Sequence, residues 1–463
     1  MPNNFLRNLP SVNQLLESPQ LKKMVETINH GVVAEGVRTF LDDLRTQVAD
    51  ATGEVSIPTP TEMADKIADW LSDEERPYLR RVINGTGIIL HTGLGRAPLA
   101  TEALSAVNDI SKGYASVEIS LATGDRGQRA KAVERLICEL TGAEAAVVTN
   151  NNASATMLTL SAMAAGKEVI VSRGQLIEIG GSYRLPDVME CSGAKLKEVG
   201  TTNKTHLVDY ERAIDPEATG ALLKVHPSNF EVVGFTKTVS TKELAKLASQ
   251  HDIPLIDDIG SGALLDYAQF GLNNEPVASD SIRDGADLIL FSGDKLIGGP
   301  QCGIIAGKKK YVERILNDQL MRAMRVGKMT LSALHATLSL YRDEEKAKQS
   351  VPLLRMLSMP TENLKMRAEK LVSLLSPVSC IASCEAIEEQ AMLGGGSLPA
   401  QKIPTWCVSI APVGSVDALT AKLRDASPAI LGRVHKDRLL LDMRTVSPGE
   451  DLEVVKVFES LEA

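Results

Sequence analysis

The sequence predicts an α/β protein whose central part is a parallel sheet covered on both faces. Apolar residues before residue 80 recur at helical spacing, short apolar runs alternate with helical stretches between about 140 and 310, and the pattern after 330 is mixed. At about 150 residues per domain, the 463-residue length suits roughly three domains. We therefore expect a helical N-terminal domain over 1–80, a large α/β domain over 81–330 and a small α+β domain over 331–463.

The N-terminal region is expected to form several short helices. Its apolar residues have helical spacing at 12–16, 21–28, 37–48 and 63–71, and ATGEVSIPTP at 51–60 is a linker punctuated by Gly and Pro. Residues 1–75 contain six basic and thirteen acidic side chains, a balance of −7. This balance repels polyanions at long range, so nucleic-acid binding here would need a local cluster of cations.

The predicted sheet is built from short continuous apolar runs. They occur at 145–149, 168–172, 221–225, 253–257, 287–292 and 303–306, with helical stretches such as 154–164 and 241–249 between them. Continuous apolar strands separated by helices indicate a parallel sheet buried on both faces. Ligands of such sheets bind beyond the carboxyl ends of the strands, so chemistry is expected in the loops that follow these runs.

The C-terminal region begins with a predicted long helix over 330–348. The rest mixes short strands and helices and carries the turn sequence GGGSLP at 394–399. This pattern indicates a smaller α+β domain.

Composition excludes several classes of protein. Hydrophobic residues make up 44% and charged residues 24%, which excludes a disordered or fibrous chain. No apolar stretch approaches the roughly 18 residues of a membrane span, and the first residues lack the features of a signal peptide, so we expect a cytoplasmic protein. Six cysteines are too few for a disulfide scaffold, no second pair lies at zinc spacing, and no metal site is expected. The net charge of −9 argues against a general nucleic-acid coat protein.

Lys295 is the strongest candidate for a catalytic residue. It lies in SGDKLIGG at 292–299, in a tight turn after an apolar strand and before two glycines. A shielded lysine can lose its proton and form a Schiff base. Ser292, three residues earlier, can donate to a phosphate. The alternative for a lone S-x-x-K is an ordinary surface lysine.

Two aspartates end another apolar strand, in IDDIGSG at 256–262. A carboxylate at a buried strand end needs a cationic partner, and the pyridinium nitrogen of pyridoxal 5'-phosphate (PLP) is such a partner. We choose Asp258, two residues before Gly260, for this role. Asp257 is better explained as a solvated turn residue.

Two further loops suit the same cofactor. In VVTNNNASA at 147–155 a strand leads into a helix whose free N–H groups would form a phosphate cup at Asn152, Ala153 and Ser154, although Asn152 and Ser154 are also ordinary helix caps. In HPSNFEVVGF at 226–235, the P-S-N sequence ending at Asn229 resembles the loop that holds the 3′-oxygen of the PLP ring in known PLP enzymes, and His226 is a candidate neighbour of the ring.

The four loops follow the order phosphate cup, P-S-N, D-x-G and S-x-x-K. This order resembles the large domain of aspartate-aminotransferase-like (fold type I) PLP enzymes. Longer stretches over roughly 80–445 resemble one family of that fold, the bacterial selenocysteine synthases, or L-seryl-tRNA(Sec) selenium transferases. These stretches are INGTGIILHTGLGRAPL (83–99), GDRGQR (124–129), NNNASA (150–155), SRGQLIEIGGSYRLPDVM (172–189), EVGTTNKTH (198–206), KVHPSN (224–229), SGDKLIGGPQCGII (292–305) and GGGSLP (394–399).

The resemblance implies a PLP enzyme that converts seryl-tRNA(Sec) to selenocysteinyl-tRNA(Sec) with selenophosphate, through an aminoacrylyl-tRNA intermediate. It further implies a homo-oligomer, a ring of dimers such as a homodecamer, and an N-terminal domain that binds tRNA(Sec). Lys295 would take the Cα proton. The acid that assists loss of the hydroxyl group is either the ammonium of Lys295 or the neighbouring Asp294.

Selenophosphate is a multiply charged anion and needs cations. We assign Arg96, in the glycine-rich HTGLGRAPL, together with Arg322 and Arg325. The latter two would share one helix face with Lys328, for which a solvated basic face is the alternative. Thr201 and Thr202 are candidates for hydrogen bonds to substrate, or else form an ordinary strand-end turn.

Two competing functions remain open. A PLP lyase acting on a small phosphorylated amino compound would explain the arginines but leaves the N-terminal 80 residues without a role. A catalytically silent tRNA-binding or scaffold protein would not be expected to retain both Lys295 and Asp258.

Overall fold

The computed structural model describes residues 9–50, 58–75, 77–127, 129–181 and 183–461. Its contacts divide the chain into two units, Met1–Arg81 and Val82–Ala463, which are described separately. Among the described residues, no helix is both long and apolar enough to cross a bilayer.

The described residues of the N-terminal unit form four helices around their own apolar core. They are α1 (Val12–Leu16), α2 (Pro19–Thr27), α3 (His30–Asp50) and α4 (Pro60–Glu74). Capping boxes at Ser11 and Thr59 begin α1 and α4, and Leu21, Val37 and Ile67 are fully buried between the helices. The predicted linker over 51–60 lies mostly outside the described residues, and α4 already begins at its last residue.

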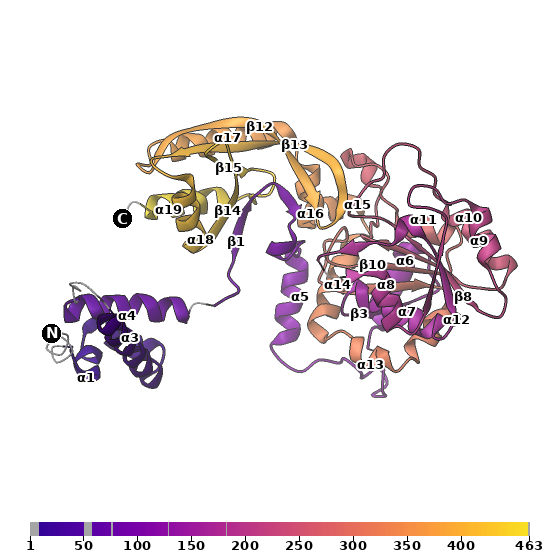
Figure 1. Cartoon of the computed structure of the whole chain (residues 1–463), viewed down its shortest axis with the longest axis horizontal. Coiled ribbons are helices and arrows are strands. Elements are labelled where there is room, and N and C mark those ends of the chain that lie inside the picture. The colour runs from indigo at the N-terminus through magenta and orange to yellow at the C-terminus, as the bar shows by residue number, and fades with distance from the viewer. Residues whose placement is uncertain (1–8, 51–57, 76, 128, 182, 462–463) are drawn as a thin grey trace. The chain divides into compact units, whose positions relative to one another are not determined.

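The second unit contains a seven-stranded sheet in the order β3-β11-β10-β9-β8-β4-β7 (Figure 1). Its strands are β3 (Ala145–Thr149), β4 (Glu168–Ser172), β7 (Lys195–Val199), β8 (Thr219–Val225), β9 (Leu255–Gly260), β10 (Leu288–Ser292) and β11 (Gly303–Gly307). The predicted parallel pairing is correct for β10, β9, β8 and β4, and β7 extends it in parallel at the edge. It is wrong for β11, which runs antiparallel to its neighbours β10 and β3. The reason is the short connection over 293–302, which has no helix to carry the chain back across the sheet.

Helices cover both faces of this sheet. Successive residues of β3 point to opposite faces, so that Val147 packs with the helices over 152–164, 185–191 and 309–316, whereas Val148 packs with those over 131–141 and 328–340. The helices of the region are α5 (Thr101–Ser111), α6 (Lys131–Thr141), α7 (Asn152–Ala164), α8 (Leu185–Cys191), α9 (Leu207–Ala213), α10 (Thr241–Gln250), α11 (Ala278–Arg283), α12 (Lys309–Leu316), α13 (Leu320–Met324), α14 (Lys328–Leu340), α15 (Glu344–Ser350) and α16 (Pro352–Ser358). Short elements complete it: η3 (Thr92–Leu94), η4 (Arg173–Gln175), β5 (Glu178–Ile179), β6 (Tyr183–Arg184) and η5 (Tyr267–Phe270).

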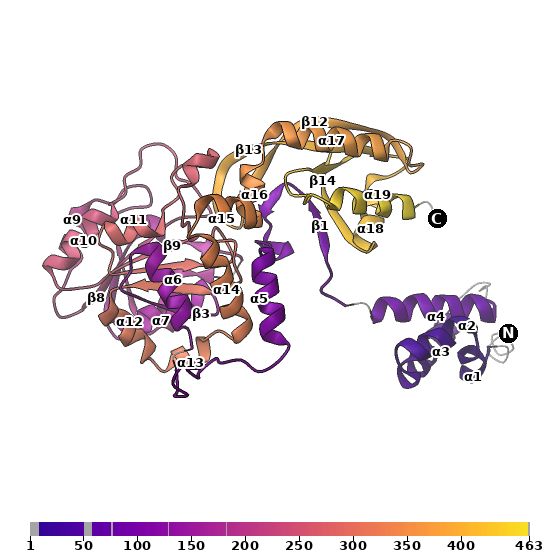
Figure 2. The ribbon, with the colours of Figure 1, turned by 180° about the vertical axis from the view of Figure 1, so that it is seen from behind.

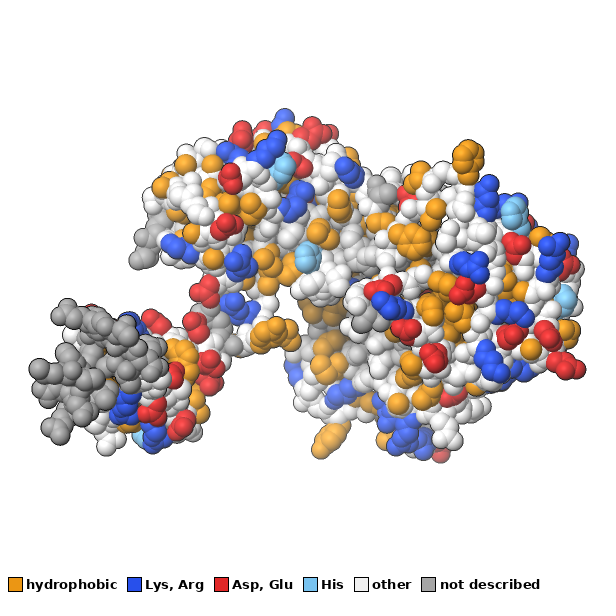
Figure 3. Space-filling view, in the orientation of Figure 1, with side chains coloured by type: hydrophobic (Ala, Val, Ile, Leu, Met, Phe, Trp, Pro, Cys, Tyr) orange, Lys and Arg blue, Asp and Glu red, His pale blue; other side chains and the backbone are white. Residues whose placement is uncertain are grey.

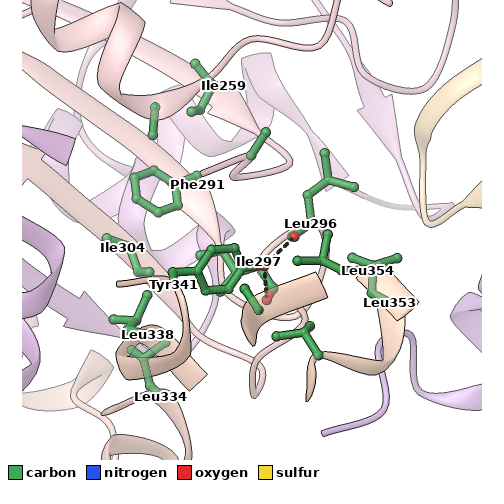
Figure 4. Close-up of a cluster of buried hydrophobic side chains, with 14 of the residues drawn as sticks. Ile259, Phe291, Leu296, Ile297, Ile304, Leu334, Leu338, Tyr341, Leu353 and Leu354 are labelled. Carbon is green, nitrogen blue, oxygen red and sulfur yellow. Dashed lines mark hydrogen bonds between the residues drawn. The ribbon is translucent and has the colours of Figure 1, made fainter. Parts of the chain in front are cut away.

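The predicted helix over 330–348 is broken. It consists of α14, which ends at Leu340, and α15, which begins at Glu344. The side chain of Asp343 accepts the N–H of Lys346 and so caps a new helix. At the break, the hydroxyl group of Tyr341 turns inward and donates to the carbonyl of Ile297 at 2.8 Å (Figure 4). The break thus anchors the chain just after Lys295.

A second sheet has the order β1-β14-β15-β13-β12-β2. Its strands are β1 (Val82–Gly85), β2 (Ile88–Leu90), β12 (Ile381–Gly394), β13 (Ser397–Pro412), β14 (Ala429–His435) and β15 (Arg438–Asp442), accompanied by α17 (Thr361–Leu375), α18 (Val416–Asp425) and α19 (Glu450–Ser460). Figures 1 and 2 show α17 along the long β12–β13 hairpin. The region after 350 therefore holds two long strands rather than only short ones.

The two sheets do not follow the expected domain boundaries. Strands β1 and β2 belong to the second sheet although they lie within 81–330. Conversely, α14 and α16 bury Leu334, Leu338 and Leu353 in the core of the first sheet although they lie mostly after 330 (Figure 4).

Candidate active site

A cavity of about 310 Å³ lies where β3, β8, β9 and β10 end. The strand-end loops singled out from the sequence therefore converge, as the strand directions require. Of the expected site residues, those lining this cavity are Arg96, Asn152, Ala153, His226, Asp258, Ser292, Asp294 and Lys295.

Lys295 is buried in the turn after β10, with 6% of its surface exposed. The N–H of Leu296 donates to the carbonyl of Ser261 at 3.0 Å, and the hydroxyl groups of Tyr267 and Tyr341 hold the next carbonyls. Burial lowers the pKa of Lys295, Arg96 acts in the same direction, and neighbouring carboxylates oppose them. A rigidly held amine that loses its proton readily suits a Schiff base.

Asp258 and Asp257 point to opposite faces of β9, as the alternation of a strand requires. Asp258 faces α7, where it accepts hydrogen bonds from Asn152 Nδ2 and Thr156 Oγ1, both at 3.0 Å. Burial raises its pKa, against these two bonds and nearby Lys295. Asp257 is not a solvated turn residue: it is fully buried, 3.2 Å from Lys224 Nζ.

The loop after β3 leads directly into α7. Asn151 is the N-cap, and its side chain accepts the N–H of Ser154 at 2.8 Å. The hydroxyl group of Ser154 donates to Asn150, so Ser154 serves the cap and does not line the cavity. Asn152 and Ala153 do line it, at the start of a thirteen-residue helix whose first N–H groups attract anions.

Arg96 and Asp294 form an ion pair at the rim of the cavity. The guanidinium of Arg96 lies 2.6 Å from Asp294 Oδ2, with 30% of the arginine side chain exposed and 8% of the aspartate side chain. The backbone of Arg96 has φ of +65°, an uncommon conformation for a residue other than glycine. Its Nε is buried without a hydrogen-bond partner.

Other expected site residues lie elsewhere. Thr201 and Thr202 line a second cavity of about 370 Å³, which shares His226 and Ser228 with the first. The hydroxyl group of Thr201 donates to the carbonyl of Lys204, as in an ordinary turn. Asn229 Nδ2 donates to the carbonyl of Glu178 at 2.8 Å, and Asn229 does not line the first cavity.

Arg322 and Arg325 do not line the first cavity of their own chain either. The expected single helix through Arg322, Arg325 and Lys328 is wrong, because α13 ends at Met324 and Arg325 is extended. Arg325 pairs by backbone with Thr149, and its guanidinium lies 3.7 Å from Glu118. Basic side chains gather on the surface near α13 (Figure 3).

Glu118 organises this basic region. It accepts hydrogen bonds from Arg129 at 2.6 and 3.1 Å and from Arg126 at 3.2 Å. Arg129 also donates to the carbonyl of Val326, next to Arg325. Arg325 is therefore placed by its backbone pairing with Thr149, at the end of β3, and by its ion pair with Glu118.

Three residues of the site were not found from the sequence. Thr156 lies one turn after Asn152 on α7, so helical periodicity places it beside Asp258. Tyr183, in β6, lines the cavity, and burial raises the pKa of its hydroxyl group. Glu275 is buried 3.9 Å from His226 and no pattern in the sequence indicates it.

The residues present fit PLP. That cofactor needs an amine for its aldehyde, a carboxylate for its ring nitrogen and N–H donors for its phosphate, and Lys295, Asp258 and the start of α7 supply them around one cavity. Asn152 Oδ1 and Arg96 Nε are buried there without partners, as expected of atoms that await a polar ligand. Within the described part of the chain, no group of three or more His, Cys, Asp or Glu side chains could hold a metal ion.

Comparisons with known proteins agree with this geometry. A solved structure of D-glucosaminate-6-phosphate ammonia-lyase is 22% identical and covers 83% of this chain and 96% of its own, with a TM-score of 0.55. It shares the fold, and the expectation of fold type I is confirmed.

Closer relatives are found among sequences. The L-seryl-tRNA(Sec) selenium transferase of Carboxydothermus hydrogenoformans is 45% identical over 448 residues, 96% of this chain and 95% of the relative. That of Hyphomonas neptunium is 46% identical over 462 residues, 99% of each chain. The family model of selenocysteine synthase N-terminal regions matches residues 6–45, and that of L-seryl-tRNA selenium transferase matches residues 82–447. The chain therefore belongs to the L-seryl-tRNA selenium transferase family.

Proposed function

We propose that this protein is a PLP-dependent enzyme that converts L-seryl-tRNA(Sec) to L-selenocysteinyl-tRNA(Sec) with selenophosphate. The observation that carries the proposal is the convergence of buried Lys295 and Asp258 on one cavity, in a chain that resembles such transferases along its whole length. Its expected location is the cytoplasm.

The roles of the residues follow from their positions. Bound PLP supplies an electron sink for the Cα of the seryl group. Asp258, held by Asn152 and Thr156, provides the negative charge beside the ring nitrogen. Lys295 Nζ, whose pKa burial lowers, takes the Cα proton. The start of α7 receives the phosphate.

Loss of the β-hydroxyl group needs an acid, because hydroxide is a poor leaving group. The two candidates are Lys295, once it carries the Cα proton, and Asp294. Asp294 Oδ2 lies 2.6 Å from the guanidinium of Arg96 and so is already engaged in an ion pair. We therefore assign the acid to Lys295, and to Asp294 the task of orienting Arg96. Addition of selenium from selenophosphate to the β-carbon of the resulting aminoacrylyl group, return of a proton to Cα and hydrolysis of the P–Se bond, which releases phosphate, complete the exchange.

Selenophosphate would bind to Arg96 together with Arg322 and Arg325. Since the latter two do not line the cavity of their own chain, we assign them to the cavity of a neighbouring subunit. This arrangement requires a homo-oligomer, and a ring of dimers such as a homodecamer is the assembly expected from the resemblance.

The N-terminal unit is assigned to recognition of tRNA(Sec). Its match to selenocysteine synthase N-terminal regions supports this role. Several of its cations are already paired with exposed acids, such as Lys22 with Glu17 and Arg38 with Glu35. Contact with tRNA would therefore be local and depend on shape as well as charge. Arg7, a further candidate contact, lies outside the described residues.

The alternative of a PLP lyase acting on a small phosphorylated amino compound has less support. The ammonia-lyase structure shares the fold at 22% identity, which does not carry a substrate with it. A lyase of that kind also gives no reason for the selenocysteine-synthase match over 6–45. A silent scaffold is disfavoured by the conjunction of Lys295 and Asp258 in the cavity.

The test is single turnover without a selenium donor. The purified protein, incubated with seryl-tRNA(Sec), is expected to retain the serine moiety as a dehydrated adduct and to release selenocysteinyl-tRNA(Sec) when selenophosphate is added. Lys295→Ala is the control. Ammonia release from a free phosphorylated amino compound, without reaction of seryl-tRNA(Sec), would favour the lyase.

A further inference from the structure

Behind the cofactor cavity lies a buried carboxyl group that the mechanism above does not use. Glu275 belongs to the loop between η5 and α11, and this loop is closed by a bridge between Ala263 and Val277. Only 1% of its side chain is exposed. Its Oε1 accepts a short hydrogen bond from the hydroxyl group of Ser261, whereas Oε2 is buried with no hydrogen-bond partner.

The unpartnered oxygen is directed at His226. The distance from Glu275 Oε2 to His226 Nε2 is 3.9 Å, slightly too long for a hydrogen bond. His226 lines both cavities and so forms part of the wall between them. Ser261, which holds the other oxygen of Glu275, accepts the N–H of Leu296 beside Lys295. Glu275 is thus linked to the loops after β8, β9 and β10.

Charged and titratable groups surround the pair of Glu275 and His226. Lys295 and Tyr267 interact with Glu275, and Lys224, Asp257 and Lys295 act on His226. Burial raises the pKa of Glu275 to about 7, opposed by Ser261 and Lys295. Burial, with Lys224, lowers the pKa of His226 to about 4. Between these values Glu275 is protonated and His226 is neutral, so the pair carries no net charge.

We propose that Glu275 is a positioning residue whose protonated carboxyl group donates to Nε2 of neutral His226 and thereby fixes the imidazole ring as a wall of the cofactor cavity. A small rotation of either side chain closes the 3.9 Å gap and satisfies an oxygen that would otherwise be costly to bury. The arrangement also keeps net charge away from Lys295. It rests on PLP binding in this cavity but not on the identity of the substrate.

The proposal predicts two opposing dependences of stability on pH. Glu275 titrates at about 7 in the folded chain against 4.5 ordinarily, so its contribution is present at low pH and is lost as pH rises through this window, up to about 300-fold in the folding constant. His226 titrates at about 4 against 6.5, so its contribution is lost as pH falls through that window. Between 4.5 and 6.5 the two largely cancel.

Single substitutions separate the two contributions. Glu275→Gln keeps a donor for His226 but cannot ionise, and Glu217→Gln, at an exposed glutamate, is the matched control. The melting temperature of the full-length PLP-loaded protein is measured from pH 4.5 to 8. The melting temperature of Glu275→Gln minus that of wild type is expected to rise as pH increases to about 7. The melting temperature of Glu217→Gln is expected to follow that of wild type at every pH. A pH-independent difference for Glu275→Gln overturns the proposal.

A spectroscopic arm tests the positioning role. At pH 6 the PLP absorbance of Glu275→Gln should match wild type, whereas Glu275→Ala, which lacks the donor, should shift the band and release PLP more readily. Equal spectra for Glu275→Ala and wild type show that His226 does not depend on Glu275 and refute the proposal. If Glu275→Ala fails to fold, the Glu275→Gln variant alone decides, because a shift of its PLP absorbance band at pH 6 also refutes the proposal. None of these measurements involves tRNA or selenium, so their failure leaves the proposed function untouched.

Discussion

Replacing Asp258 by asparagine should separate the stability of the protein from its chemistry. In the wild-type protein Asp258 Oδ1 accepts from Asn152 Nδ2 at 3.0 Å and from the N–H of Gly260 at 3.2 Å, and the oxygen of an asparagine can accept both bonds. The hydroxyl group of Thr156, which donates to Asp258 Oδ2, can turn to accept from the new amide instead. Because burial raises the pKa of Asp258, the folded apo protein bears the cost of a buried charge, and the amide removes it. The apo variant should therefore be at least as stable as wild type at pH 8.

The effect of the Asp258→Asn substitution should appear in PLP binding and in catalysis instead. A charge-assisted hydrogen bond contributes roughly 1.5–3 kcal/mol, so PLP affinity should fall by about 10- to 150-fold. The Cα proton should be removed much more slowly, because the ring loses its counter-charge.

Asp257 is the matched control, since it is adjacent in sequence and equally buried. Its carboxylate pairs with Lys224, whose side chain is only 18% exposed, and accepts from the hydroxyl group of Thr241 at 2.9 Å. Removing one member of a buried pair leaves the other uncompensated, so Asp257→Asn should destabilise the protein by about 3 kcal/mol while PLP still binds. Chemical denaturation of apo protein and PLP titration by absorbance measure both quantities. If Asp257→Asn were the variant that loses PLP, the assignment of the two aspartates would be reversed.

Three further outcomes follow from the geometry. Lys295→Ala should lose both the PLP absorbance band and turnover, since no other lysine among the described residues lines the cavity; an unchanged band would identify a different amine. Arg325→Ala should leave dehydration of seryl-tRNA(Sec) intact but raise the selenophosphate concentration needed for turnover, since each lost charge-assisted hydrogen bond costs about 1.5–3 kcal/mol of binding free energy. Assemblies that mix Arg325→Ala with Lys295→Ala subunits should regain activity, because each variant supplies the residue that the other lacks. Failure of Arg325→Ala at the dehydration step would contradict this role. A chain beginning at Pro77 should fold and bind PLP but lose its preference for seryl-tRNA(Sec). The double substitution Lys22→Glu and Lys23→Glu should lower the slope of the logarithm of the tRNA binding constant against the logarithm of salt concentration by about one unit for each phosphate group that is no longer neutralised. Unaltered tRNA(Sec) binding in both variants would refute the assignment of the N-terminal unit.

The sequence predicts the site where chemistry follows a buried strand. Lys295 and Asp258 each come after an apolar run, and the carboxyl ends of neighbouring strands must meet at one edge of the sheet. Alternation along β9 further distinguishes Asp258 from Asp257, since side chains two residues apart share a face and adjacent ones do not. Thr156 was not predicted, although the same kind of reasoning applies to it, because it lies one helical turn after Asn152.

Other features have no local signal. Strands β1 and β2 pair with β14 and β12, which lie at the far end of the chain, so no window of sequence indicates that they leave the large domain. Glu275 lies in an irregular loop, and its burial depends on Ser261 and His226, which reach it from other strands. The break between α14 and α15 does have a local signal in the N-cap Asp343, but the hydrogen bond from Tyr341 to the carbonyl of Ile297 has none.

The cations that line the cavity are too few for one chain to balance both proposed anions, the phosphate of PLP and selenophosphate. Among the described residues, its lining offers two cations, Arg96 and Lys295, against the carboxylates of Asp258 and Asp294, and His226 is neutral because burial lowers its pKa to about 4. Arg96 is already paired with Asp294. The phosphate of PLP is placed at the helix start, but selenophosphate adds several negative charges that these two cations alone would not balance. Additional cations must therefore come from outside the cavity of the chain itself. Basic side chains gather on the surface near α13, the helix that contains Arg322 and is followed by Arg325 (Figure 3), and this surface can supply them to a neighbouring subunit.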